Sequence, residues 1–170
     1  MPAAPTEPVL VVGGVAHLYQ GDLDLGRHAV EQLATSPPPG VLVEEFSYGA
    51  VAVAQRLDEL RPDLLVLVGA KARGRVPGTV ERRELEAQPR DPDAVQAAIG
   101  DAITGYIDLD LVVEVARGLG ALPARAVAIE VEPAATQPSE LLSPIAEAAL
   151  REAVELVRLE VAAFSVQATG

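Results

Sequence analysis

Three polar residues that can do chemistry lie close together near the start of the chain: His17, Asp22 and Asp24. They follow an apolar run at residues 10–12 and a double glycine at 13–14, a pattern typical of a buried strand that ends in a turn. Imidazole and carboxylate groups can bind a divalent metal ion or transfer protons. In an open α/β sheet such groups gather beyond the C-terminal ends of the strands. The loop after this first strand is therefore the first candidate site.

The elements that must position this loop alternate between strand and helix. The five branched apolar residues at 64–68 predict a central strand buried on both faces, and the charges at 79–85 predict an edge strand. Further strands are expected at 41–46 and 126–131, and helices at 24–35, 50–60, 91–103, 109–119 and 143–164. This order predicts an α/β fold, a three-layer sandwich with a mainly parallel twisted sheet of about five strands and helices on both faces.

Composition narrows the class of protein. With 170 residues, of which 49% are hydrophobic, the chain suits one domain at 8–165 after a flexible tail at 1–7. A net charge of -12 argues against nucleic acid as a partner, and the absence of cysteine excludes disulfides and thiolate metal sites. No signal sequence and no apolar run of about 20 residues is present, so we expect a cytoplasmic protein that does not bind membranes.

The order of motifs resembles the hydrogenase maturation endopeptidases, nickel-dependent enzymes that trim the C-terminus of the NiFe-hydrogenase large subunit. Four stretches carry the resemblance: an apolar strand, glycine-containing loop, acidic pair and helix at 10–33, then LLVLVGAKARGRVPGTV at 64–80, LPARAVAIEVEP at 122–133, and LLSP at 141–144. They occur in the family's order and cover almost the whole chain. The resemblance implies a single domain that is similar to these proteases.

The resemblance also implies a nickel ion held by an acidic residue of the first loop, an Asp at the end of the second strand and a His ahead of the fourth long helix. Those positions fall on Leu23, near Ser47, and at or near Gly105. The family's Asp in the central strand is Gly69, and the Asn of its first loop is His17. Leucine, serine and glycine cannot replace carboxylate and imidazole ligands as a set. We therefore predict no metal, no other cofactor and no catalytic residue.

A displaced metal site is the alternative. Asp24 lies one residue beyond the implied ligand and Glu45 two residues before Ser47, so His17, Asp24 and Glu45 could form it together. Otherwise His17, Asp22 and Asp24 are loop polar groups that cap the first helix or remain in solvent. The candidate cleft residues are Gly14, His17, Asp22, Asp24, Glu45, Ser47 and Gly105.

Two weaker patterns are also present. The sequence GGVAHLYQG differs from the Gly-x-Gly-x-x-Gly pattern of dinucleotide sites, which favours the simpler interpretation that these glycines let the chain turn and the helix pack closely. The basic residues Lys71, Arg73 and Arg75 form either a small anion site or, as is commoner, a solvated loop.

Two hypotheses about function therefore remain. In the first, the chain is a non-catalytic accessory or binding protein whose partner is a NiFe-hydrogenase large-subunit precursor. In the second, it is an active hydrogenase maturation endopeptidase that uses displaced ligands. The sequence leaves open whether the chain is an enzyme and which oligomeric state it adopts.

Overall fold

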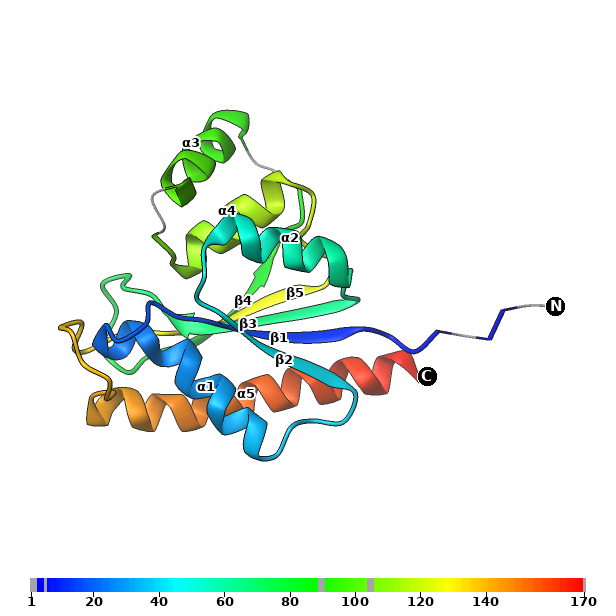
Figure 1. Ribbon diagram of the computed structural model, residues 1–170. Coiled ribbons are helices and arrows are strands. Elements are labelled where there is room, and N and C mark those ends of the chain that lie inside the picture. The colour runs from blue at the N-terminus through cyan, green and yellow to red at the C-terminus, as the bar shows by residue number, and fades with distance from the viewer. Residues whose placement is uncertain (1–2, 5, 89–90, 104–105, 170) are drawn as a thin grey trace.

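A five-stranded sheet lies between two layers of helices in the computed structural model, which describes residues 3–4, 6–88, 91–103 and 106–169 (Figure 1). The strand order is β2-β1-β3-β5-β4. The four parallel strands are β1 (Leu10–Val15), β2 (Val41–Phe46), β3 (Leu64–Ala70) and β5 (Ala126–Val131), and the edge strand β4 (Val80–Leu85) is antiparallel to β5.

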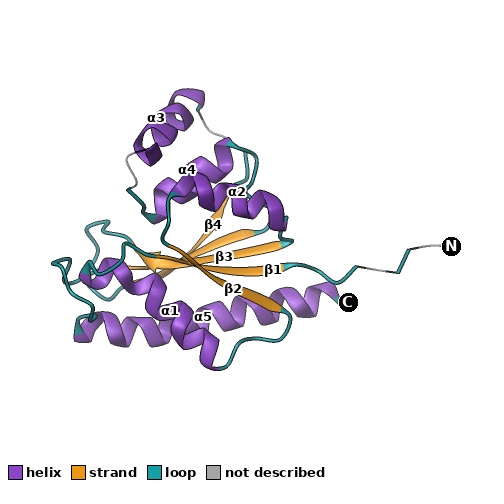
Figure 2. Ribbon diagram, viewed as in Figure 1, coloured by secondary structure: helices purple, strands orange, loops and turns teal. Residues whose placement is uncertain are grey.

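Helices cover both faces of this sheet (Figure 2). One face carries α1 (Leu25–Thr35) and α5 (Pro144–Ala168), and the other carries α2 (Ala50–Leu60) and α4 (Leu109–Gly118), with α3 (Pro92–Ile103) packed on α4. A short 3-10 helix, η1 (Gly21–Asp24), leads into α1. The predicted three-layer α/β sandwich with a mainly parallel sheet is confirmed. Among the described residues, no helix has both the length and the apolar character needed to cross a bilayer.

The central strand β3 explains why the core has two halves. Its side chains alternate between the faces, so that Leu65 and Leu67 join the cluster under α2 and α4. Leu64, Val66 and Val68 join the cluster under α1 and α5. Every residue of β3 is buried, as its unbroken apolar run predicted.

The double glycine in β1 does not form a turn, so the predicted end of the first strand was wrong. The strand continues through Gly13 and Gly14 to Val15. Close packing explains both glycines: a β-carbon on Gly13 would overlap the Phe46 ring, and one on Gly14 would overlap the carbonyl oxygen of Gly26. Glycine is needed here because α1 and the Phe46 ring approach the strand backbone closely.

Candidate functional site

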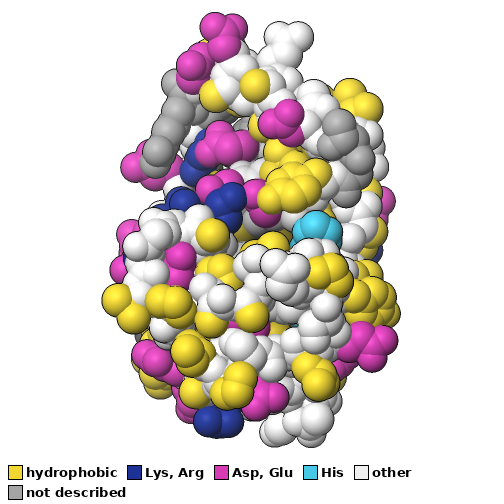
Figure 3. All heavy atoms as spheres, turned by 90° about the vertical axis from the view of Figure 1, so that its left-hand side faces the viewer, with side chains coloured by type: hydrophobic (Ala, Val, Ile, Leu, Met, Phe, Trp, Pro, Cys, Tyr) yellow, Lys and Arg dark blue, Asp and Glu magenta, His cyan; other side chains and the backbone are white. Residues whose placement is uncertain are grey.

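A cavity of ≈ 230 Å³ opens where β1 and β3 end (Figure 3 looks onto this edge of the sheet). Its floor is apolar and is formed by Val15, Leu23, Ala70, Ile107 and Leu109. Its polar lining comes from the loops after β1, β3 and β5 and from the segment that leads into α4: His17, Lys71, Thr136, Tyr106 and Asp108. The cavity therefore lies at the C-terminal edge of the sheet, where the sequence predicted a site.

An ion pair lies at the mouth of the cavity. The Lys71 ammonium donates a hydrogen bond of 2.6 Å to Oδ2 of Asp108, and the Tyr106 hydroxyl donates one of 3.2 Å to the same oxygen. Oδ1 of Asp108 accepts the backbone N–H of Leu111 at 2.8 Å and so caps α4. Burial alone would raise the pKa of Asp108, but these bonds, with Lys71 first, hold it below its ordinary value. Lys71 and Asp108 are therefore both charged at neutral pH.

His17, in the first loop, lines the same cavity. Its ring meets the Tyr106 ring edge-on, with 6.0 Å between the ring centroids. The loop backbone holds the residue in place, because the His17 N–H donates to the Leu23 carbonyl at 3.0 Å and its carbonyl accepts the N–H of Gln20 at 3.3 Å. Within the described parts of the chain, neither ring nitrogen of His17 has a hydrogen-bond partner. Both ring nitrogens are thus available to a ligand.

Asp22 is completely buried and neither caps α1 nor meets solvent, contrary to that expectation. Its carboxylate accepts the backbone N–H groups of Ala134, Ala135 and Ser143 and the Ser143 hydroxyl, at 2.8–2.9 Å. Burial alone would raise the pKa of Asp22, but these hydrogen bonds, with the Ser143 N–H first, lower it below its ordinary value. Asp22 therefore fastens the first loop to the loop before α5.

The other predicted acidic residues make local contacts. Oδ2 of Asp24 accepts two bonds from the Arg27 guanidinium, at 2.9 and 2.5 Å, and lies 4.0 Å from Nε2 of His28. Its buried Oδ1 has no hydrogen-bond partner among the described residues, yet the charge of Asp24 is already balanced by Arg27. At the end of β2, Oγ of Ser47 donates to the Glu45 carboxylate at 2.8 Å.

Of the candidate cleft residues that the structure describes, only His17 is among the residues that line the cavity. Gly14 lies in β1 beneath Gly26, and Gly105 lies outside the described residues. In the part of the chain that the structure describes, no three His, Asp or Glu side chains form a group that could hold a metal ion. The structure therefore does not bring His17, Asp24 and Glu45 together as ligands.

The residues present do not fit the nickel ion that the resemblance implies. Leu23, at the position of the first acidic ligand, contributes an apolar side chain to the cavity floor. Gly69, at the position of the central-strand Asp, has no room for a side chain, because a β-carbon would lie 2.8 Å from the Val15 carbonyl oxygen. Asp108 is already paired with an ammonium group. A divalent cation would find an apolar floor and an occupied carboxylate there.

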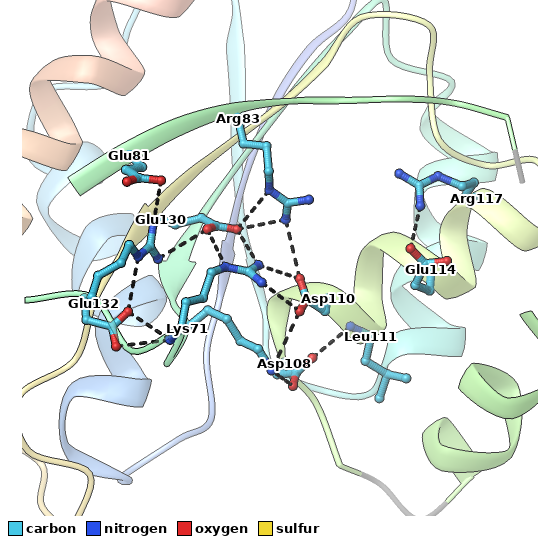
Figure 4. Close-up of polar contacts among 12 residues, drawn as sticks. Lys71, Glu81, Arg83, Asp108, Asp110, Leu111, Glu114, Arg117, Glu130 and Glu132 are labelled. Atoms are coloured by element: carbon cyan, nitrogen blue, oxygen red, sulfur yellow. Dashed lines mark hydrogen bonds and ion pairs between the residues drawn. The ribbon is translucent and has the colours of Figure 1, made fainter. Parts of the chain in front are cut away.

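A cluster of ion pairs lies beside the cavity and fixes the loop between β3 and β4 (Figure 4). The buried carboxylate of Glu130 receives Arg73 at 2.7 and 2.8 Å and Arg83 at 2.8 Å. Glu132 accepts the backbone N–H groups of Arg73 and Gly74 at 2.9–3.1 Å. Burial alone would raise the pKa of Glu130, but Arg73 and then Arg83 hold it below its ordinary value.

Arg73 and Arg75 are therefore neither solvated nor part of an open anion site. Arg75 also lies 3.3 Å from the Glu132 carboxylate and 2.8 Å from that of Glu81. The carboxylates that the three basic loop residues bind belong to the protein itself.

Several site residues were missed by sequence reasoning, although some had a signal. Asp108 directly precedes an amphipathic helix, which is the N-cap position. Glu130 interrupts an apolar strand and Glu132 directly follows it. A charged side chain that is buried at such a position requires a partner. Lys71 was named only in the weak pattern of a basic loop, and Tyr106 had no signal, because their place in the cavity depends on how distant loops meet.

No protein-family model and no curated protein matches the sequence. Solved structures do match the fold, and they define its class: it is the fold of the hydrogenase maturation endopeptidases. The hydrogenase 2 maturation peptidase of a Thaumarchaeota archaeon is 23% identical, with a TM-score of 0.60 over 88% of this chain and 95% of that chain. The Escherichia coli endopeptidase HybD is 22% identical, with a TM-score of 0.60 over 88% and 89%. The protease HycI of Thermococcus kodakarensis is 18% identical, with a TM-score of 0.63 over 90% and 92%. The resemblance seen in the sequence is thus confirmed for the fold.

Proposed function

We propose that this chain is a hydrogenase maturation protease-like protein that acts as a non-catalytic accessory or binding protein. One observation carries the proposal: the cavity at the C-terminal edge of the sheet has Leu23 in its floor and a neutralised Lys71–Asp108 pair at its mouth. Asp108 cannot become a metal ligand without leaving the ammonium unpaired, which is costly for partly buried charges. The proposal keeps the cytoplasmic location expected from the sequence.

The proposed partner is a NiFe-hydrogenase large-subunit precursor. Support comes from the shared fold and from exposed aromatic side chains on this edge. All three tyrosines of the chain, Tyr19, Tyr48 and Tyr106, lie in loops at the C-terminal edge and are 48–55% exposed. Tyrosine is enriched in protein interfaces because it buries a large rigid area and keeps a polar tip. A partner that docks on this edge would cover all three rings.

Calorimetry with nickel chloride separates this proposal from an active endopeptidase. We expect no stoichiometric binding to the purified chain and no change in the mass of an added large-subunit precursor. One tightly bound ion per chain, or a shortened precursor, would overturn the non-catalytic role.

Precursor binding is tested separately by surface plasmon resonance. Replacing Tyr48→Ser should weaken binding by about tenfold, because an aromatic interface anchor is lost. Leu159→Ser is the matched control, since Leu159 is 62% exposed on the far part of α5. Equal affinities of both variants would contradict docking at this edge.

A further inference from the structure

We propose that the cavity at the ends of β1 and β3 binds a small carboxylate that carries an apolar body. This inference goes beyond the proposed function, because it requires neither a hydrogenase nor any protein partner. It combines the volume of the cavity, the apolar character of its floor and the hydrogen-bonding groups at its mouth.

The floor accounts for the apolar body of the ligand. The side chains at the base of the cavity are apolar and buried: Val15, Ala70, Ile107 and Leu109 are 1–7% exposed. The partly buried Leu23 completes the floor from the first loop. A volume of ≈ 230 Å³ lies below the roughly 300 Å³ at which pockets for drug-sized ligands begin. The cavity therefore suits a branched or aromatic group of one side chain's size.

The mouth accounts for the carboxylate. An ammonium group has three N–H donors, and within the described residues Lys71 uses one of them, on Asp108. Asp110 lies 3.9 Å from the ammonium, which is beyond hydrogen-bonding distance. His17 adds a ring N–H that no described residue accepts. The available donors thus outnumber the acceptors, and the pairing of Lys71 with a ligand carboxylate would be charge-assisted.

Asp108 can share Lys71 with a ligand without losing its place. Its Oδ1 remains on the Leu111 N–H at the start of α4, and its Oδ2 still accepts the Tyr106 hydroxyl. A cationic ligand has no comparable opening, because both oxygens of Asp108 are already engaged and Lys71 would repel it.

The two histidines of the chain make a direct test possible by NMR of the imidazole C–H signals. His17 lines the cavity, whereas His28 lies on α1 beside Arg27 and serves as an internal reference. We expect 4-methylpentanoate to shift the His17 signal saturably and to leave the His28 signal in place. The uncharged 4-methylpentanamide should bind at least about tenfold more weakly, because it cannot form the charge-assisted pair. Equal binding of acid and amide, or no shift at His17, would overturn the proposal.

Substitutions in the floor provide a second readout. Leu23→Glu places a like charge beside the ligand and should abolish the shift at His17, whereas Leu23→Met keeps the floor apolar and should preserve it. His28 and the far-ultraviolet circular dichroism spectrum report whether each variant is folded. Carboxylate binding by a folded Leu23→Glu variant would contradict a ligand seated on this floor.

The same chemistry can come from a free acid or from the last residue of a peptide. N-acetyl-glycyl-glycyl-leucine and its C-terminal amide form the peptide arm of the titration, and 4-methylpentanoate forms the free-acid arm. Tighter binding of the peptide acid would identify the C-terminus of a peptide as the natural source of the carboxylate. Tighter binding of 4-methylpentanoate would identify a small free acid as the source. A failure of precursor docking leaves this titration unaffected, so the two proposals can fail separately.

Discussion

The hydroxyl of Ser143 donates a 2.8 Å hydrogen bond to the carboxylate of Asp22 across 121 residues of chain. The same hydroxyl accepts the backbone N–H of Ala146 and caps α5, so Asp22 holds the capping side chain itself in position. One buried carboxylate thus joins the loop that carries His17 to the start of the longest helix.

Replacing Asp22→Asn should lower the free energy of unfolding by roughly 2–4 kcal/mol, because an amide nitrogen would face donors that need an acceptor. Urea denaturation followed by circular dichroism measures the change. Asp58→Asn, on the exposed side of α2, removes the same charge and should shift the free energy by less than about 0.5 kcal/mol. Similar losses in both variants would mean that net charge, not the hydrogen bonds of Asp22, sets the effect.

Acid should destabilise the protein partly through Asp22. Its pKa in the folded state lies below the ordinary value of 3.8, so its contribution is complete above that value and is lost as the pH falls through the folded pKa. Asp108 and Glu130 shift in the same direction and add to the effect. The unfolding free energy should therefore begin to fall below about pH 5 and continue to fall as the pH passes through the lowered pKa values, and Asp22→Asn should flatten this slope. A variant with the unchanged slope would show that Asp22 does not contribute.

Replacement by alanine should have opposite effects on stability at one glycine of β1 and at one glycine of α3. Gly14→Ala should lower the free energy of unfolding by roughly 2–3 kcal/mol. The new β-carbon would overlap the Gly26 carbonyl oxygen, which is a backbone atom and cannot move away as a side chain could. Gly100→Ala, in the interior of α3 with open space around it, should stabilise by about 0.5–1 kcal/mol. Thermal melting compares them, and a neutral Gly14→Ala would contradict the close approach of α1 to β1.

The buried charge of Glu130 should matter more than any surface pair. Glu130→Gln leaves Arg73 and Arg83 without the carboxylate that they share. It should therefore lower the free energy of unfolding by roughly 2–4 kcal/mol. Glu59→Gln, which weakens an exposed pair with Arg56, should cost less than about 1 kcal/mol. Hydrogen exchange at Arg73 and Gly74 should also rise in Glu130→Gln, because the loop between β3 and β4 loses a tether. Unchanged protection there would assign the tether to Glu132 alone.

The sequence predicted the layers and most element bounds because each signal was local. The strand at Val41–Phe46 and the helix at Ala50–Leu60 follow from apolar periodicity between residues that break it. At the double glycine, the close packing of a helix was predicted correctly but the turn was wrong, because two glycines look the same in a sequence whether the strand ends there or continues beneath a helix.

The cavity was predicted only in position. Its edge of the sheet follows from the strand order, and His17 follows from the first loop. Its ion pair joins Lys71 to Asp108 over 37 residues, and no local pattern shows which loops will meet. Asp22 was selected as a chemical group, yet its three backbone donors come from a segment more than a hundred residues away.

The Asp22 anchor also sets an order of events during synthesis. A growing polypeptide that ends before residue 134 contains every strand of the sheet but none of the groups that bind this carboxylate. On the ribosome, this anchor of the first loop can therefore be completed only after residue 143 has emerged.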